Sequence, residues 1–177
     1  MRKTLVLVLL SLAVAGGSAM AMDPNPKLKD LDWFAHNYDC TGIAYANPMA
    51  PEHPTRATVT GDWTLGGTWV RFSYIEMKTP KNPMPVAVRG FFGYDPEIKK
   101  FVVGTVDNMG GYSTGAADGW NGDAITFEGP WHLGTQTVAA RDTFTKTGAK
   151  SMTHVGEMQM DGKWMKYGQE TCTRAKK

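Results

Sequence analysis

The chain has 177 residues, of which 42% are hydrophobic, 11% aromatic and 20% charged, and its formal net charge is +2. This length suits one domain, and this composition is typical of a globular chain rather than a disordered one. Two of the 19 basic residues, Arg2 and Lys3, lie in a predicted leader, so 17 basic residues remain against 17 acidic ones. A neutral chain lacks the basic surface that binds nucleic acid or an anionic membrane, and we expect neither as a partner.

Residues 1–21 have the pattern of a secretory signal peptide. Two basic residues precede an apolar run from Leu5 to Ala15, and the segment ends in Ala19-Met20-Ala21. The run is shorter than the ~20 apolar residues that a membrane-spanning helix needs, and no later segment is apolar for long enough. We therefore predict that residues 22–177 form a single exported domain, in the periplasm or outside the cell.

The first element of the mature chain is predicted to be a short helix. Between Lys27 and Asn37, the apolar residues Leu28, Leu31 and Phe34 recur at intervals of three, which places them on one face of one or two helical turns.

Beyond this helix the apolar pattern changes to a period of two. From Arg56 to Leu65, apolar residues and glycine alternate with polar residues, which indicates a half-buried strand. Gly-Gly, Asn-Gly and Asp-Gly pairs, which tight hairpins prefer, recur between such segments. The predicted strands are Tyr38–Tyr45, Arg56–Leu65, Thr68–Lys78, Pro85–Tyr94, Phe101–Asp107, Tyr112–Gly119, Ala124–Gly129, Thr137–Thr145, Ser151–Gln159 and Trp164–Thr173.

Cys40 and Cys172 are the only cysteines, and they lie in the first and last predicted strands. An oxidising compartment permits them to pair. We predict a structural disulfide between them; two separate buried thiols are the alternative.

The fold class predicted from these elements is all-β. A meander of about ten short strands must curl or split into two sheets, and glycines inside the strands suit the bends of a barrel. A disulfide between the first and last strands favours closure. We therefore predict a closed up-and-down antiparallel barrel of about ten strands with a short N-terminal helix, in preference to a two-sheet sandwich.

Four segments resemble a known family. These are Leu31-Asp-Trp-Phe-Ala-His-Asn-Tyr-Asp-Cys-Thr-Gly42, Gly67-Thr-Trp-Val-Arg-Phe72, Gly90-Phe-Phe-Gly-Tyr-Asp-Pro96 and Val103-Gly-Thr-Val-Asp-Asn-Met-Gly-Gly111. The chain is similar to an uncharacterised bacterial domain-of-unknown-function family with a calycin-like barrel, related in shape to lipocalins and fatty-acid-binding proteins. The resemblance implies the fold, but no activity, cofactor or catalytic residue.

The sequence favours a binding protein over an enzyme. It has no nucleophile elbow, no phosphate loop and no dinucleotide or zinc-protease motif. A ten-stranded barrel encloses more room than an eight-stranded one, which can just hold one ligand. We therefore expect a small, mostly apolar molecule in the interior, with an arginine at its polar end. The candidate ligand-binding residues are Trp69, Arg71, Arg89, Tyr94, Tyr112 and Trp131.

Two other functions stay open at this stage. His154, Met158 and Met160 share one face of a predicted strand, and imidazole and thioether ligands suit Cu(I), while a lone strand histidine suits haem iron. We expect His154 and Met158 to point into the barrel. A small hydrolase or isomerase would need paired carboxylates at a barrel mouth, for which the candidates are Asp107, Asp118, Asp123 and Glu128.

Overall fold

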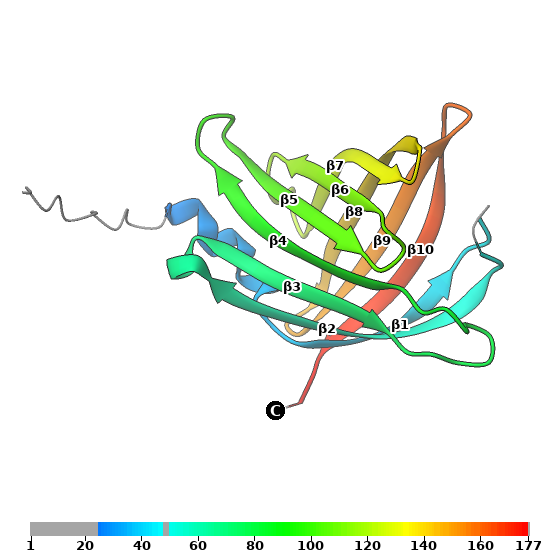
Figure 1. The fold of residues 1–177 in the computed structure, drawn as a ribbon. Helices are drawn as coiled ribbons and strands as arrows, with labels where there is room; N and C mark the ends of the chain where they lie inside the picture. The colour runs from blue at the N-terminus through cyan, green and yellow to red at the C-terminus, as the bar shows by residue number, and fades with distance from the viewer. Residues whose placement is uncertain (1–24, 48–49, 177) are drawn as a thin grey trace, which may run out of the picture.

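The computed structural model describes residues 25–47 and 50–176, so the predicted signal peptide lies outside the described residues. Within the described part, ten strands form a closed antiparallel barrel in the order β1-β10-β9-β8-β7-β6-β5-β4-β3-β2 (Figure 1). Each strand pairs with its neighbours in sequence, and β1 closes the sheet against β10, so the predicted up-and-down barrel is confirmed. The strands are β1 Tyr38–Ala44, β2 His53–Thr64, β3 Trp69–Glu76, β4 Ala87–Asp95, β5 Lys100–Asp107, β6 Tyr112–Ala117, β7 Ala124–Leu133, β8 Gln136–Gly148, β9 Ser151–Met160 and β10 Lys163–Arg174.

The N-terminal helix is a 3₁₀ helix, η1, over Pro26–Phe34, and it ends before the predicted boundary at Asn37. A 3₁₀ helix has three residues per turn, so the three-residue spacing of Leu28, Leu31 and Phe34 places all three on one buried face. A second 3₁₀ turn, η2 at Leu65–Gly67, connects β2 to β3.

Helix η1 lies across one end of the barrel (Figure 1), and we call this the closed end. The Phe34 ring stacks on Phe92 at a centroid distance of 4.4 Å and lies 5.0 Å from the Phe144 ring. The end of η1 lies close to β2 at Gly61. A glycine is required at this position, because a Cβ there would collide with the Phe34 carbonyl oxygen.

The opposite end, which we call the mouth, is formed by the β1–β2, β3–β4, β5–β6, β7–β8 and β9–β10 connections. Strand β2 leaves this end at His53, three residues before the predicted start at Arg56. No helix among the described residues is long and apolar enough to span a membrane.

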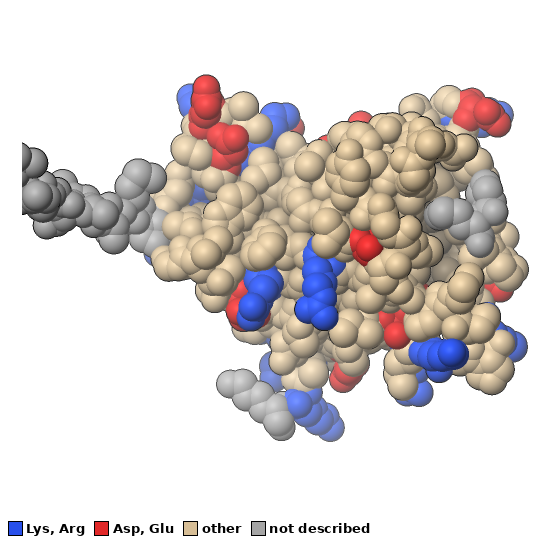
Figure 2. Space-filling model, viewed as in Figure 1, with Lys and Arg blue, Asp and Glu red and all other residues tan. Residues whose placement is uncertain are grey.

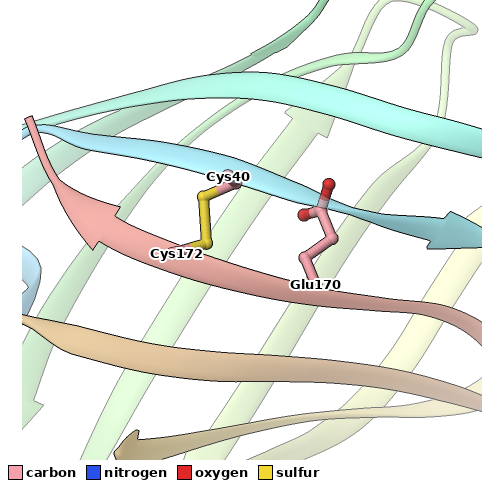
Figure 3. Close-up of side chains that lie close together, drawn as sticks. All are labelled: Cys40, Glu170 and Cys172. Atoms are coloured by element: carbon pink, nitrogen blue, oxygen red, sulfur yellow. A yellow bond between two sulfur atoms is a disulfide. The ribbon is translucent and has the colours of Figure 1, made fainter. Parts of the chain in front are cut away.

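The predicted disulfide is confirmed. Cys40 of β1 and Cys172 of β10 are register partners and are bonded across a sequence separation of 132 residues. Both are buried with Tyr38, Ala57 and Met152. In Figure 3 the disulfide and the Glu170 side chain project from neighbouring strands into the same region of the molecule.

Candidate functional site

The barrel contains a cavity of about 450 Å³ between the closed end and the mouth. Small-molecule sites occupy roughly 300–1,000 Å³ and are mostly apolar with a few placed polar groups. The cavity wall fits that description. Its apolar lining includes Phe72, Val88, Phe92, Val103, Phe127 and Phe144, and residues of the mouth that border it include Asn47, Ala50, Lys81, Pro83, Met84 and Met109.

The first polar group of the cavity is centred on Glu170 of β10. Its carboxylate oxygen Oε1 accepts a 2.8 Å hydrogen bond from the Thr55 hydroxyl and a 3.0 Å bond from the Tyr74 hydroxyl. Glu170 is only 6% exposed. Its position follows from strand geometry: it lies two residues before Cys172 and therefore points to the same, inner side of β10.

The second polar group is centred on Glu76 at the end of β3, also 6% exposed. Oε2 of Glu76 accepts hydrogen bonds from the Asn82 side-chain amide at 2.7 Å and from the Val86 backbone N–H at 2.9 Å. The Tyr74 hydroxyl lies 3.5 Å from Oε1 of Glu76 and 3.0 Å from Glu170, so Tyr74 lies between the two carboxylates.

The third polar group joins β8, β9 and β10. Oδ1 of Asp142 contacts Nε2 of His154 at 2.8 Å and accepts a 2.5 Å hydrogen bond from the Tyr167 hydroxyl. The His154 ring stacks on Phe144 with a centroid distance of 4.8 Å, and the Tyr167 ring lies 5.5 Å from that of Trp131.

The electrostatics of these groups are coupled. Burial lowers the pKa of His154, but the hydrogen bond and charge of Asp142, with the charge of Glu170, outweigh it and raise the pKa above its ordinary value. Burial and the negative charges of Glu170 and Glu76 raise the pKa of Tyr74 far above the usual range. Burial and Asp142 do the same for Tyr167. Both phenols therefore stay protonated and serve as hydrogen-bond donors.

The cavity carries an excess of negative charge. Four acidic residues line it, namely Glu76, Asp107, Asp142 and Glu170. Among the lining residues that the structure describes, Lys81 is the single lysine or arginine, and it lies exposed at the mouth. The polar interior can therefore accept hydrogen bonds and bind positive charge, and it offers little to an anion.

The six predicted ligand-binding residues divide between the two faces of the wall. Trp131 lines the cavity, and Tyr94 packs inward against Phe101 towards the closed end. Trp69, Arg89 and Tyr112 lie together along an open groove on the outer wall. Figure 2 shows an outer face of the barrel on which charged side chains are sparse, and among the exposed residues of this wall are Phe91, Val106 and Tyr112.

The expectation that an arginine anchors the ligand from inside is wrong. Arg71 forms an exposed ion pair with Asp62, its register partner, at 3.0 Å, and Arg89 lies on the outer groove. The physical reason is that the opposite faces of β3 and β4, with Val70, Phe72 and Phe92, are more apolar and fill the interior. The arginines consequently face water.

The predicted orientation of His154 and Met158 is confirmed. His154 lines the cavity, and Met158 is buried beside its register partner Ala140. Met160 lies farther along β9, half-buried next to the mouth. Within the described residues, one cluster has the geometry to hold a metal ion: Cys40, Glu170 and Cys172. Its two sulfur atoms are bonded to each other, however, and a thiolate is the form that binds metal.

The four candidate catalytic carboxylates do not come together. Asp107 borders the cavity near the mouth, where it accepts hydrogen bonds from the Met109 and Gly111 backbone N–H groups and so holds a turn. Asp118 and Asp123 belong to the β6–β7 connection at the closed end, and Asp118 pairs with Lys100. Glu128 is exposed on the outer wall. This set therefore forms no acid–base pair.

The interior carboxylates Glu76, Asp142 and Glu170 were not among the predicted site residues. They lie on β3, β8 and β10, so only the closed barrel brings them to one space. One signal was available for Glu170, because a paired Cys172 must point inward and the residue two positions earlier shares its face.

These features define the class of the protein: a closed ten-stranded antiparallel barrel with an internal cavity that opens at one end. The chain belongs to the family described as "Protein of unknown function (DUF1579)", which it matches over residues 29–174. The fold is similar to the crystal structure of Rv2717c from M. tuberculosis, with a TM-score of 0.65 and 13% identity, over 87% of this chain and 100% of that one. No curated protein matches.

Proposed function

We propose that this protein binds a small, mostly apolar molecule inside its barrel and does not act on it chemically. The observation that carries the proposal is the cavity of about 450 Å³, whose wall is largely aromatic and aliphatic and whose polar groups are few and clustered. The mouth supplies a route from solvent, since residues of three of its loops border the cavity.

The first test is binding of an uncharged dye that fluoresces in apolar surroundings, N-phenyl-1-naphthylamine. We expect saturable binding, and we expect Val88→Trp to weaken it at least about tenfold, because Val88 lines the cavity and a larger side chain there occupies the ligand's space. The matched control is Val106→Trp on the outer wall, where the side chain is 57% exposed. Equal loss in both variants, or no saturable binding to the wild type, would contradict the proposal.

A second candidate function is retention of copper or haem by His154. Its support is that Asp142 holds one ring nitrogen of His154, an arrangement typical of metal-ligating histidines. Native mass spectrometry of the protein purified from its own source separates the candidates. A copurifying organic molecule of low mass supports the first, and copper or haem that is lost in His154→Ala supports the second.

We also propose that the protein is exported. The leader pattern of residues 1–21 and a buried disulfide, a bond typical of oxidising compartments, both support this. Fractionation of the native cells tests it, and recovery of the full-length chain with free thiols in the cytoplasm would contradict it.

A further inference from the structure

We propose that the ligand is an organic cation, an amine or ammonium group attached to an apolar body. This inference rests on the proposed binding function and adds the charge of the ligand. The cationic group would lie among Glu170, Glu76 and Asp142, and the apolar body would extend along the aromatic wall towards the closed end. The site is the cavity itself, and its carboxylates determine which charge it accepts.

The first argument is that neither Glu76 nor Glu170 has a cationic hydrogen-bond partner among the described residues. Both are 94% buried, and the groups that donate hydrogen bonds to them are neutral: the Thr55 and Tyr74 hydroxyls, the Asn82 amide and the Val86 backbone N–H. Within the described residues neither forms an ion pair with lysine or arginine. Buried carboxylates are normally paired with a cation, and a bound ammonium group would provide one.

The second argument is the aromatic composition around these carboxylates. Tyr74, Trp131 and Tyr167 all line the cavity, and the rings of Trp131 and Tyr167 lie 5.5 Å apart. The faces of such rings attract ammonium groups, most strongly where water is excluded. A cavity that combines carboxylates with tyrosine and tryptophan rings therefore suits an organic cation better than a neutral polar group.

The third argument is exclusion of acids. His154 is the one basic group deep in the described cavity, and Asp142 already occupies its Nε2 at 2.8 Å. The three interior carboxylates would repel an anionic head group in this poorly solvated space. A fatty acid would therefore bind worse than an alcohol or an amine of the same chain length.

The experiment compares three probes that share one chain: decylamine, decanol and decanoate, titrated into the full-length mature protein at pH 7 by calorimetry. An aliphatic amine is protonated at this pH, because its pKa resembles that of lysine. We expect decylamine to bind about tenfold or more tighter than decanol, a difference of about 1.4 kcal/mol, and decanoate to bind weakest. Decanoate binding as tightly as decylamine would overturn the inference while leaving the binding function intact. Failure of all three probes would overturn the binding function as well.

Variants test whether the interior carboxylates cause the preference for decylamine over decanol. Glu170→Gln removes one charge but keeps an oxygen for the Thr55 and Tyr74 hydroxyls, so we expect the preference for decylamine over decanol to fall about tenfold. Glu128→Gln makes the same change on the exposed outer wall and should leave the preference unchanged. Equal effects of both variants would overturn the inference. Glu76→Gln provides an independent interior variant if Glu170→Gln does not fold, and the comparison of probes on the wild type requires no variant.

Discussion

The interior of the barrel is filled with aromatic side chains at the η1 end and is partly empty at the mouth end. At the closed end, Phe34, Phe92 and Phe127 pack with Leu31 and Ile125, which are 0% and 1% exposed. At the mouth end the same inner face carries Glu76, Glu170, Asp142 and their hydrogen-bond donors around the cavity. The same strands thus provide a close-packed core in one half and a polar cavity in the other.

This difference separates the part of the barrel that stabilises the fold from the part that we propose binds a ligand. Close packing maximises dispersion contacts and the apolar area removed from water, so we attribute most of the stability to the closed half. The mouth half gives up part of that burial, and it keeps Glu76 and Glu170, whose hydrogen-bond donors are neutral groups. Such a local conflict between burial and charge is expected at functional sites rather than in a structural core.

The largest expected effect on stability comes from loss of the disulfide, which lies on the cavity wall and joins the first strand to the last. The double variant Cys40→Ala/Cys172→Ala should lower the free energy of unfolding by up to about 5 kcal/mol, because the bond closes a loop of 132 residues in the unfolded chain. Urea unfolding followed by near-ultraviolet circular dichroism measures this. A loss below ~1 kcal/mol would show that barrel closure depends on β1–β10 pairing and not on the bond.

The next largest effect compares how much stability the two halves lose when a phenylalanine is truncated to alanine. Phe34→Ala should destabilise the protein by roughly 3–5 kcal/mol, because it leaves a void among closely packed rings. Phe72→Ala removes the same number of atoms from a side chain that is only half-buried in the native protein, whereas Phe34 is 5% exposed, so we expect roughly half that loss. Urea midpoints of the two variants measured together test the comparison. Equal losses would mean that the two halves are packed alike.

The sequence predicted the closed half better than the open half. Strand alternation and hairpin turns predicted the strands to within a few residues, and the spacing of Leu28, Leu31 and Phe34 predicted the helix that covers the closed end. The predicted leader peptide and the positions of the two cysteines predicted the closure of the barrel. These features depend on local periodicity or on one pair of residues, which a sequence displays directly.

The mouth half could not be predicted in the same way. In β3 both faces carry aromatic residues, Trp69 on one and Phe72 and Tyr74 on the other, so alternation alone did not decide which side is inside. The interior charges come from separate strands and meet only after closure. An isolated glutamate in a strand is usually solvent-exposed, so its sequence context gave no reason to place it in a cavity.

The smallest expected effect is the contribution of His154, in the mouth half, to the pH dependence of the free energy of unfolding. Its pKa is raised in the folded protein by Asp142 and Glu170. A group whose folded pKa exceeds its unfolded value of about 6.5 stabilises the fold fully below that pH, and the contribution disappears as the pH rises through the folded value. The free energy of unfolding of the wild type relative to His154→Gln should therefore be higher at pH 5.5 than at pH 9.

Two points make this measurement specific to the mouth half. Tyr74 and Tyr167 stay protonated over this range because their pKa values are raised, so neither contributes to the difference. In an Asp142→Asn background the His154 effect should shrink or reverse, because burial, which lowers the pKa of His154, is then opposed only by the charge of Glu170. A stability difference that grows with pH in the wild-type background would show that His154 is held neutral, and that the negative charge around it is weaker than the cation-binding proposal requires.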